Sequence, residues 1–315
     1  MMKKSLTRSE TARILLAHDN YAIVTHRRPD GDTVGSSAVL CMGLRQLGKK
    51  AFILANPEIT PKYAHLHQGL TKDTVAEGDF VVTVDVASEN MLPDCFKDLS
   101  FDLRIDHHGS ATSFTPVELV EPQAAACGET VYGVLKEMGA ELDIPMAEAL
   151  YTAVSTDTGC FRYANTTADT LKVAAACKEA GADTFSINQA LFETNTLARL
   201  KVQAYMLETA KFLQDGKIAI CCLPKAVEAQ FGAGEDDLDN ISGFPRSIEG
   251  VKLAVTLRDE NETKVKMSVR AVPGWDASAL CAKFGGGGHK GAAGASMSLS
   301  MDEAVAAVIA ALPIV

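Results

Sequence analysis

The strongest constraint on the fold is an alternation, over roughly the first 185 residues, of short apolar runs with longer segments of helical periodicity. Strands that alternate with helices usually lie in one mostly parallel sheet that is joined by crossover helices. The pattern therefore predicts an α/β fold with a mostly parallel sheet and flanking helices. The expected strands are 21–25, 51–55, 80–84, 103–105 and 117–120, and the expected helices are 34–47, 124–138, 145–156 and 168–179.

The pattern changes after Gly216, and 315 residues are long for a single compact domain. Residues 197–213 carry apolar side chains at helical intervals and are followed by Gly216, which predicts a connecting helix. Strand-like runs at 217–223, 251–257, 265–269 and 295–299 then mix with helices near 276–284 and 301–312. We expect a first domain over residues 1–190, a linker helix over 191–216 and a smaller α/β domain over 217–315.

Composition excludes several classes of protein. The net charge of −10 argues against a protein that coats long nucleic acid, because such proteins need broad basic surfaces. No apolar stretch approaches the ~18 residues of a membrane helix, and residues 1–10 lack the apolar core of a secretory signal. The eight cysteines are scattered without a C-x-x-C pair, as reduced thiols are. We expect a cytoplasmic protein with no membrane partner.

Acidic and histidine side chains stand directly after several predicted strands, and one acid stands where a helical pattern breaks. Singly, each has an ordinary explanation: Asp30-Gly31-Asp32 could be a turn, and Asp85 a helix N-cap. Together they occupy the carboxyl ends of parallel strands, where open α/β sheets hold their active sites. The other histidines, His18, His65 and His67, stand in polar surroundings and are expected at the surface. The candidate site residues of this region are His26, Asp30, Asp32, Asp85, Asp106, His107, His108 and Asp157.

Aspartate and histidine side chains in this number suit a pair of divalent ions. Hydrolysis of a phosphoester needs a nucleophilic water at neutral pH and a way to neutralise charge on the phosphoryl oxygens. Two ions about 3.5–4 Å apart provide both. At least one carboxylate must reach both ions, and mixed Asp/His ligation suits Mn²⁺ better than Ca²⁺. The pattern therefore predicts a two-metal hydrolase that uses Mn²⁺, with Mg²⁺ or another divalent ion left open.

A glycine-rich segment, residues 284–294, is the second candidate site. Four consecutive glycines, residues 285–288, leave backbone N–H groups unobstructed for an anion, and His289 and Lys290 add donors. The segment is neither a P-loop nor a dinucleotide fingerprint, and a flexible linker is the alternative. Arg270 ends a strand-like run and could direct a bidentate guanidinium at the same phosphate, or be a solvated arginine at a strand end.

The ordered set of motifs resembles the DHH phosphoesterase superfamily, and within it the DHHA1 branch of nanoRNases and 3′-phosphoadenosine-5′-phosphate (pAp) phosphatases. The resemblance covers residues 26–36, 81–88, 106–108 and 155–167, then Arg270 and residues 285–294.

The resemblance also implies a role for each residue. His26, Asp30 and Asp85 would hold one Mn²⁺, and Asp32, Asp85, His107 and Asp157 the other. His108 would contact the scissile phosphate, and Asp106 would orient the histidines. The rest of the nucleotide would be bound by Arg270, Gly287, Gly288 and His289.

The implied activity is the release of mononucleotides from very short oligonucleotides, and of the 3′-phosphate of pAp, by attack of water at the two metals. A phosphodiesterase for cyclic or linear dinucleotides (c-di-AMP, pApA, pGpG) is the main alternative. A manganese pyrophosphatase ranks lower, because the resemblance would place a basic C-terminal motif where residues 285–294 stand. A nucleotide-binding regulator with a silent centre is the alternative outside the enzymes. A homodimer is the default expectation for assembly.

Overall fold

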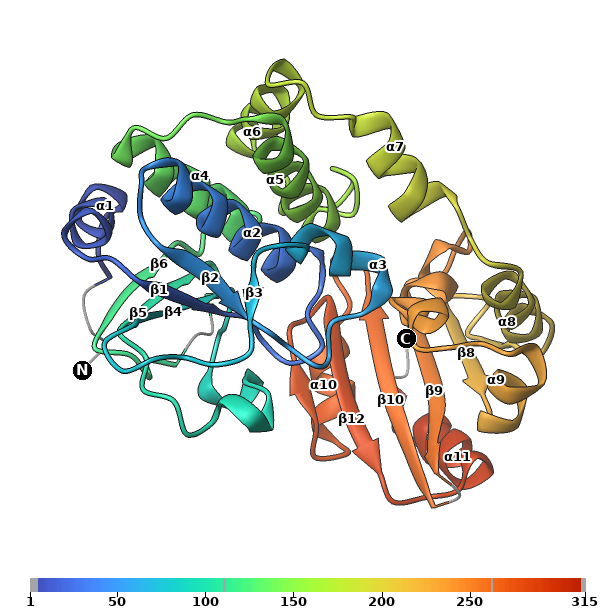
Figure 1. Cartoon of the computed structure of the whole chain (residues 1–315). Coiled ribbons are helices and arrows are strands. Elements are labelled where there is room, and N and C mark those ends of the chain that lie inside the picture. Colours follow the sequence, from blue (N-terminus) through green and yellow to red (C-terminus); the bar gives the residue numbers. More distant parts are fainter. Residues whose placement is uncertain (1–4, 110–111, 262, 313–315) are drawn as a thin grey trace. The chain divides into compact units, whose positions relative to one another are not determined.

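The computed structural model describes residues 5–109, 112–261 and 263–312 (Figure 1). Residues 1–4, on which part of the expectation about a secretory signal depends, lie outside this range. The chain divides into two compact units, Met1–Thr194 and Asn195–Val315, and each contains a sheet with helices. The predicted α/β fold class is confirmed. Within the described residues, no helix has the length and apolar character needed to cross a membrane.

Six parallel strands form the sheet of the first unit, in the order β3-β2-β1-β4-β5-β6. The chain leaves β1 toward β2 on one side and returns to β4 on the other. A reversal of this kind opens a crevice at the carboxyl ends of the strands, where ligands bind in open α/β sheets. The strands are β1 Tyr21–Val24, β2 Ala51–Leu54, β3 Thr71–Lys72, β4 Phe80–Val84, β5 Leu103–Asp106 and β6 Val117–Val120.

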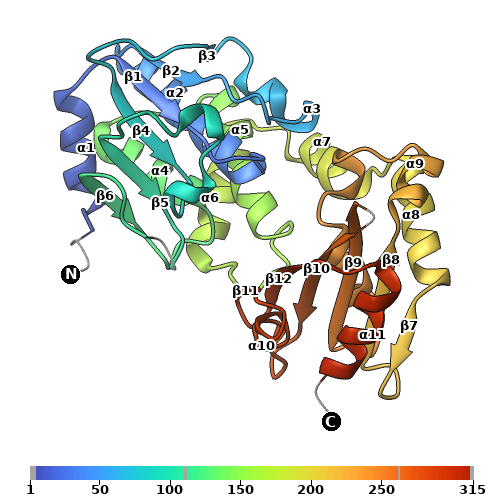
Figure 2. The same ribbon diagram turned by 90° about the horizontal axis from the view of Figure 1, so that it is seen from below.

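The two faces of this sheet are covered differently. The largest apolar core lies between the strands and a layer that includes α2, α4 and α5 (Figure 1). A smaller core covers the other face, where residues 86–101 contribute short 3₁₀ helices (Figure 2). The helices of this unit are α1 Arg8–Ala17, α2 Gly31–Gln46, α3 Pro61–Ala64, α4 Cys127–Met138, α5 Ile144–Asp157, α6 Ala168–Glu179 and α7 Thr184–Asn188.

Helix α2 packs almost backbone to backbone against α5, because glycines lie on the shared side. A Cβ atom on Gly35 would meet the carbonyl oxygen of Ala149 at 2.4 Å, and one on Gly31 would meet the Thr156 side chain at 2.5 Å. Side chains larger than hydrogen would push the helices apart. The close packing holds the first turn of α2 beside the last turn of α5, and both turns carry candidate site residues.

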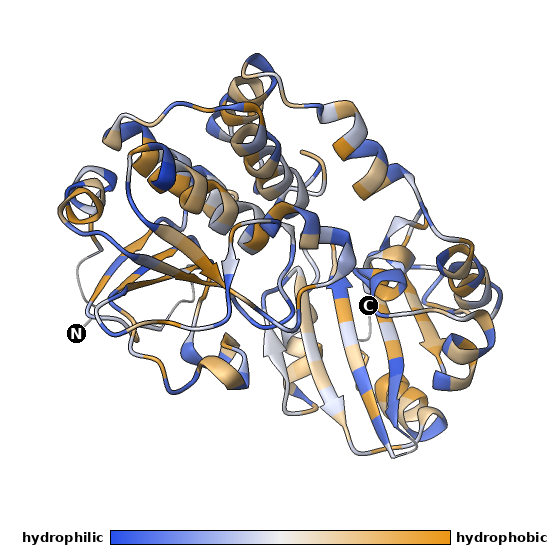
Figure 3. Cartoon of the chain, in the orientation of Figure 1, coloured by the Kyte–Doolittle hydropathy of each residue, from blue (hydrophilic) through white to orange (hydrophobic). Residues whose placement is uncertain are grey.

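The second unit contains a mixed six-stranded sheet, in the order β11-β12-β10-β9-β8-β7. Strands β8 and β9 are parallel, and the other neighbouring pairs are antiparallel. Buried and more exposed residues alternate along β10, and Figure 3 shows the matching alternation of hydropathy. The elements are α8 Leu197–Glu208, β7 Lys211–Leu213, β8 Ile218–Leu223, α9 Lys225–Phe231, β9 Leu253–Asn261, β10 Lys264–Ala271, α10 Ala277–Ala282, β11 Gly287–Gly288, β12 Ala292–Met297 and α11 Met301–Ala311.

Several predicted helices have different bounds in the structure, and two of the differences have a clear physical cause. Helix α2 begins at Gly31, because the Asp30 carboxylate accepts hydrogen bonds from the backbone N–H groups of Asp32 and Thr33, both at 3.1 Å. Asp32 is therefore helical and not part of a loop. The helix predicted over 197–213 ends at Glu208, because residues 211–213 pair with β8. The domain boundaries at 190 and 216, and the role of the intervening residues as a linker, stay a prediction.

The expectation of surface positions holds for His18 and His65 but is wrong for His67, which is 5% exposed. Its Nε2 atom lies 2.9 Å from Ser37 Oγ and 3.1 Å from the carbonyl oxygen of Val34. The imidazole thus fills a buried position against α2. The polar residues around it in the sequence gave no sign of this tertiary contact.

Substitution of Gly35 by alanine should lower the free energy of unfolding by about 1–3 kcal/mol, because the new methyl group meets backbone that cannot rotate away. The control is Gly43→Ala in the same helix. Its methyl group would meet only the side chain of Leu135, and a gain of about 1 kcal/mol in helix propensity opposes the cost. Urea unfolding compares the two variants, and equal losses would contradict the close approach of α2 and α5.

Candidate metal centre

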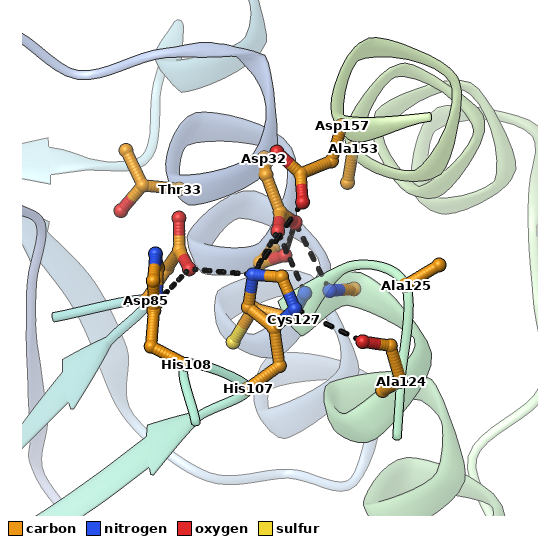
Figure 4. A network of polar contacts seen from close by, with 12 residues as sticks. Asp32, Thr33, Asp85, His107, His108, Ala124, Ala125, Cys127, Ala153 and Asp157 are labelled. Atoms are coloured by element: carbon orange, nitrogen blue, oxygen red, sulfur yellow. Dashed lines mark hydrogen bonds and ion pairs between the residues drawn. The ribbon is translucent and has the colours of Figure 1, made fainter. Parts of the chain in front are cut away.

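The structure brings the candidate residues of the first unit together at the carboxyl end of its sheet. Seven side chains supply nitrogen or carboxylate oxygen atoms that form three overlapping groups, and within each group the atoms lie within 4.8 Å of one another. Figure 4 shows the part of this cluster around His107. The groups are His26, Asp30 and Asp85; Asp32, His107 and Asp157; and Asp85, His107 and His108.

The carboxylate of Asp85 lies between two histidines of the cluster. Its Oδ2 atom lies 3.6 Å from His26 Nε2, and its Oδ1 atom lies 3.5 Å from His107 Nε2. The residue directly follows β4 and has a φ of 61°, a left-handed conformation that is uncommon for a residue other than glycine. Asp85 is 2% exposed, and its Oδ1 atom accepts no hydrogen bond. A buried carboxylate oxygen in this state is costly unless a cation lies beside it.

His107 faces carboxylates with one nitrogen and a carbonyl with the other. Its Nε2 atom lies 3.6 Å from Asp32 Oδ2 and 3.5 Å from Asp157 Oδ2, and its Nδ1 atom lies 3.1 Å from the carbonyl oxygen of Ala124. When His107 is neutral, this contact places its proton on Nδ1 and leaves the Nε2 lone pair toward the carboxylates. The separations at Nε2 are too long for hydrogen bonds. Ligands about 2.1 Å from one divalent ion lie about 3.0–3.5 Å apart, so the donor set fits an ion between them.

Asp32 is held by the N-terminus of α4, which lies far from it in the sequence. Oδ2 accepts a hydrogen bond from the backbone N–H of Cys127 at 2.6 Å, and Oδ1 accepts one from that of Gly128 at 3.1 Å. Ser36 Oγ donates to Oδ1 at 2.8 Å from one turn further along α2. Sequence reasoning missed these partners. The spacing of Ser36 four residues after Asp32 was a usable signal, whereas nothing in the sequence indicated the contact with α4.

Asp106 supports the histidines that follow it. It is fully buried, and its Oδ1 atom accepts hydrogen bonds from the backbone N–H groups of His107 and His108 at 2.8 and 3.2 Å. The same oxygen lies 2.8 Å from His108 Nδ1, and this contact raises the pKa of His108. Asp106 is not in any of the three groups of possible metal ligands. These contacts agree with the orienting role that the resemblance implies, which stays a prediction.

The cluster holds protons when no cation is present. Burial, with the charge of Asp85 adding to it, raises the pKa of Asp32 well above its ordinary value, and burial also raises that of Asp85. Burial raises the pKa of Asp157 to about 7, against the opposing effect of His107. Burial lowers the pKa of His107, but the three carboxylates outweigh it and raise that pKa to about 9. Concentrated negative charge of this kind favours a divalent cation.

The glycine-rich segment of the second unit forms a hairpin. Strand β11 pairs with β12, and His289 and Ala292 exchange backbone hydrogen bonds at 2.8 and 3.2 Å across the turn. Arg270 on β10 pairs in register with Ala292, so the candidate residues of this unit are neighbours.

The two glycines of β11 differ in whether the fold requires glycine at their position. Gly288 has a φ of 142°, and a Cβ atom on it would meet Ala292 O at 2.7 Å, so the fold itself needs glycine there. A Cβ atom on Gly287 would meet nothing within 4 Å, so the fold gives no reason for glycine at that position. The ligand-binding roles of Arg270, Gly287, Gly288 and His289 stay a prediction.

Known proteins resemble this chain over most of its length. Residues 20–154 match the model of the DHH family, N-terminal domain, and residues 215–312 match that of the DHHA1 domain. A bifunctional oligoribonuclease and PAP phosphatase, NrnA, from Thermus thermophilus is 34% identical over 296 residues, which are 92% of this chain and 88% of that protein. A protein of the same name from Bacillus subtilis is 26% identical, over 94% of this chain and 95% of its own.

Among solved structures, an exopolyphosphatase-related protein from Bacteroides fragilis has a TM-score of 0.87 at 25% identity. The match covers 96% of this chain and 94% of that one. The family resemblance inferred from the motifs is confirmed by these matches.

The affinity of the metal-free protein for Mn²⁺ should rise between about pH 6 and pH 8. Asp157 is protonated below about pH 7 and His107 below about pH 9, and both must lose a proton before they bind a cation. Binding should therefore release protons, which calorimetry measures in buffers of different ionisation enthalpy. The Asp157→Asn variant should release fewer protons near pH 6. An affinity that does not change with pH would contradict the raised pKa values.

Proposed function

Because the chain belongs to the DHH family of phosphoesterases and carries a DHHA1 domain, we propose that it releases mononucleotides from very short oligonucleotides and the 3′-phosphate from pAp. It is a hydrolase of the phosphodiesterase or phosphatase type. One observation carries the proposal: one carboxylate oxygen of Asp85 faces His26 and the other faces His107. A carboxylate shared between two ions needs this arrangement. The activities named for the Thermus and Bacillus relatives support the choice of substrates.

We assign the side chains to two ions as the resemblance implies. His26, Asp30 and Asp85 would hold one ion, and Asp32, Asp85, His107 and Asp157 the other. The pair would supply a nucleophilic water at neutral pH and neutralise charge on the phosphoryl oxygens. Mn²⁺ is our first choice, because two imidazoles and four carboxylates make a mixed nitrogen and oxygen donor set.

His108 would contact the scissile phosphate. Its Nδ1 faces the buried Asp106 carboxylate at 2.8 Å, which fixes the ring and raises its pKa. A protonated imidazole donates a charge-assisted hydrogen bond to a phosphate oxygen. In this role His108 would stabilise the charge that develops on the phosphoryl group, and Asp106 would keep the ring in position.

The second unit would bind the part of the nucleotide that does not react. Arg270 lies beside the hairpin that carries Gly287, Gly288 and His289, and a guanidinium matches a phosphate with two parallel hydrogen bonds. The open space beside Gly287 would admit a ligand close to the backbone. The net charge of −10 disfavours long nucleic acid, which agrees with a short substrate.

Asp85→Asn should lower turnover at least ~100-fold, because the neutral amide cannot bridge two cations. The assay follows Mn²⁺-dependent phosphate release from pAp, with a panel of pApA, pGpG and cyclic dinucleotides beside it. Asp169→Asn is the control, since the Asp169 side chain is 79% exposed and paired with Lys172 on the surface. Wild-type rates in Asp85→Asn would contradict the two-ion assignment. A wild-type protein that binds these nucleotides without turnover would favour the alternative of a nucleotide-binding regulator with a silent centre.

Gly287→Ala should raise KM several-fold while kcat and the melting temperature stay close to the wild-type values. The methyl group meets no atom of the protein within 4 Å, so any loss reports on a ligand that approaches the backbone there. Gly234→Ala is the matched control, because its methyl group would meet only Asp237 Oδ2 at 3.8 Å, outside the hairpin. An unchanged KM in Gly287→Ala would remove this position from the binding site.

A further inference from the structure

One short segment contacts two of the four side chains that we assign to the second ion. It comprises residues 124–129 and is named here the α4 cap segment. The carbonyl oxygen of Ala124 lies 3.1 Å from His107 Nδ1. The first two backbone N–H groups of α4 donate to the carboxylate of Asp32 at 2.6 and 3.1 Å (Figure 4). Any shift of this segment would therefore move or release both side chains.

Asn165 joins the same segment to a third ligand. Its Nδ2 group donates one hydrogen bond to the carbonyl oxygen of Ala125 and one to that of Asp157, each at 3.1 Å. The amide has two N–H donors, and the two bonds lead to two different elements of the fold. Asn165 thus fixes the last residue of α5 relative to the α4 cap segment.

Glu129 anchors the segment from the inside. It is 4% exposed, and its Oε1 atom accepts a hydrogen bond from the backbone N–H of Ala125 at 3.3 Å and from Thr170 Oγ1 at 2.6 Å. Thr170 is fully buried on α6. A buried carboxylate is tolerated where hydrogen bonds satisfy it, and these two bonds tie the segment to α6.

The first ion's own ligands are held by other parts of the chain. His26 Nδ1 lies 2.7 Å from the carbonyl oxygen of Arg27, and Asp30 accepts its hydrogen bonds from the first turn of α2. Apart from the shared Asp85, the α4 cap segment therefore serves the second ion alone. A change in this segment should have a selective effect on metal binding.

We propose that Asn165 and Glu129 are positioning residues for the second ion, which they control through the α4 cap segment. The proposal rests on the two-ion site under Proposed function. His107, Asp32 and Asp157 come from three different elements, and the segment with its two anchors sets their mutual distances. Partners that orient metal ligands in this way typically change metal affinity about 10–100-fold.

Mn²⁺ titration of the metal-free protein tests the proposal, by calorimetry and by electron paramagnetic resonance, which distinguishes paired from single Mn²⁺ ions. Asn165→Ala should lower the affinity for one of the two ions at least about tenfold and leave the affinity for the other within about twofold of the wild-type value. The signal of the ion pair should give way to that of a single ion. Glu129→Ala should have the same effect, and Glu129→Gln, which keeps an oxygen acceptor, should recover most of the affinity.

Asn188→Ala is the matched control, because the Asn188 amide group donates its hydrogen bond to the hydroxyl group of Tyr151 at 2.9 Å in the same unit, and not to a metal ligand or to the α4 cap segment. Both ions should bind this variant as they bind the wild type. If the wild type binds two ions, either of two results would overturn the positioning role. One is unchanged affinity of Asn165→Ala for both ions, and the other is an equal loss of affinity for both. A wild-type protein that binds fewer than two ions would instead overturn the proposed function, and this inference with it.

Discussion

The centre depends on the close approach of three like charges to the imidazole of His107. The carboxylates of Asp32, Asp85 and Asp157 all face His107 Nε2 at 3.5–3.6 Å. Repulsion between carboxylates is strong where water is excluded, and burial adds its own penalty, so the carboxyl pKa values rise. The fold tolerates this arrangement because protons or cations relieve it. The centre is therefore shaped to receive positive charge, and the left-handed backbone of Asp85 adds strain at the same place.

The rest of the first unit holds these charges in a fixed arrangement. Glycines at positions 31 and 35 allow α2 to approach α5 closely. Gly128 does the same for the start of α4, because a Cβ atom at that position would meet Ala153 Cβ at 2.9 Å. Three helices can then present polar groups to one point at the edge of the sheet. Backbone N–H groups at the N-terminus of α4 satisfy the Asp32 carboxylate and add a favourable dipole. Close packing and electrostatics are thus two requirements on the same short stretches of chain.

Most of the centre that the sequence predicted lies at or just after strand ends. His26, Asp85 and residues 107–108 follow buried strands, and Asp106 is the last residue of one. The carboxyl ends of parallel strands share one edge of a sheet. The contact of Asp32 with α4, and the two bonds of Asn165, depend on helix packing that periodicity does not encode. The glycine-rich segment shows a different limit: its sequence did not predict a strand, but pairing with β12 outweighs the low strand propensity of glycine. The local sequence pattern therefore indicated which residues form the centre, and tertiary contacts determine how these residues are arranged.

On the proposed assignment, the two ions depend on folding to different degrees. His26 and Asp30 lie within one short stretch before α2, so only Asp85 must come from elsewhere to complete the first set. The second set joins α2, the residues after β4 and β5, and the end of α5. A cation that binds only this assembled set stabilises the native state by mass action, because the unfolded chain offers no such site. The second ion would therefore gain affinity from the same helix packing that it reinforces. A loosened α4 cap segment would weaken the binding of that ion and the packing of the helices together.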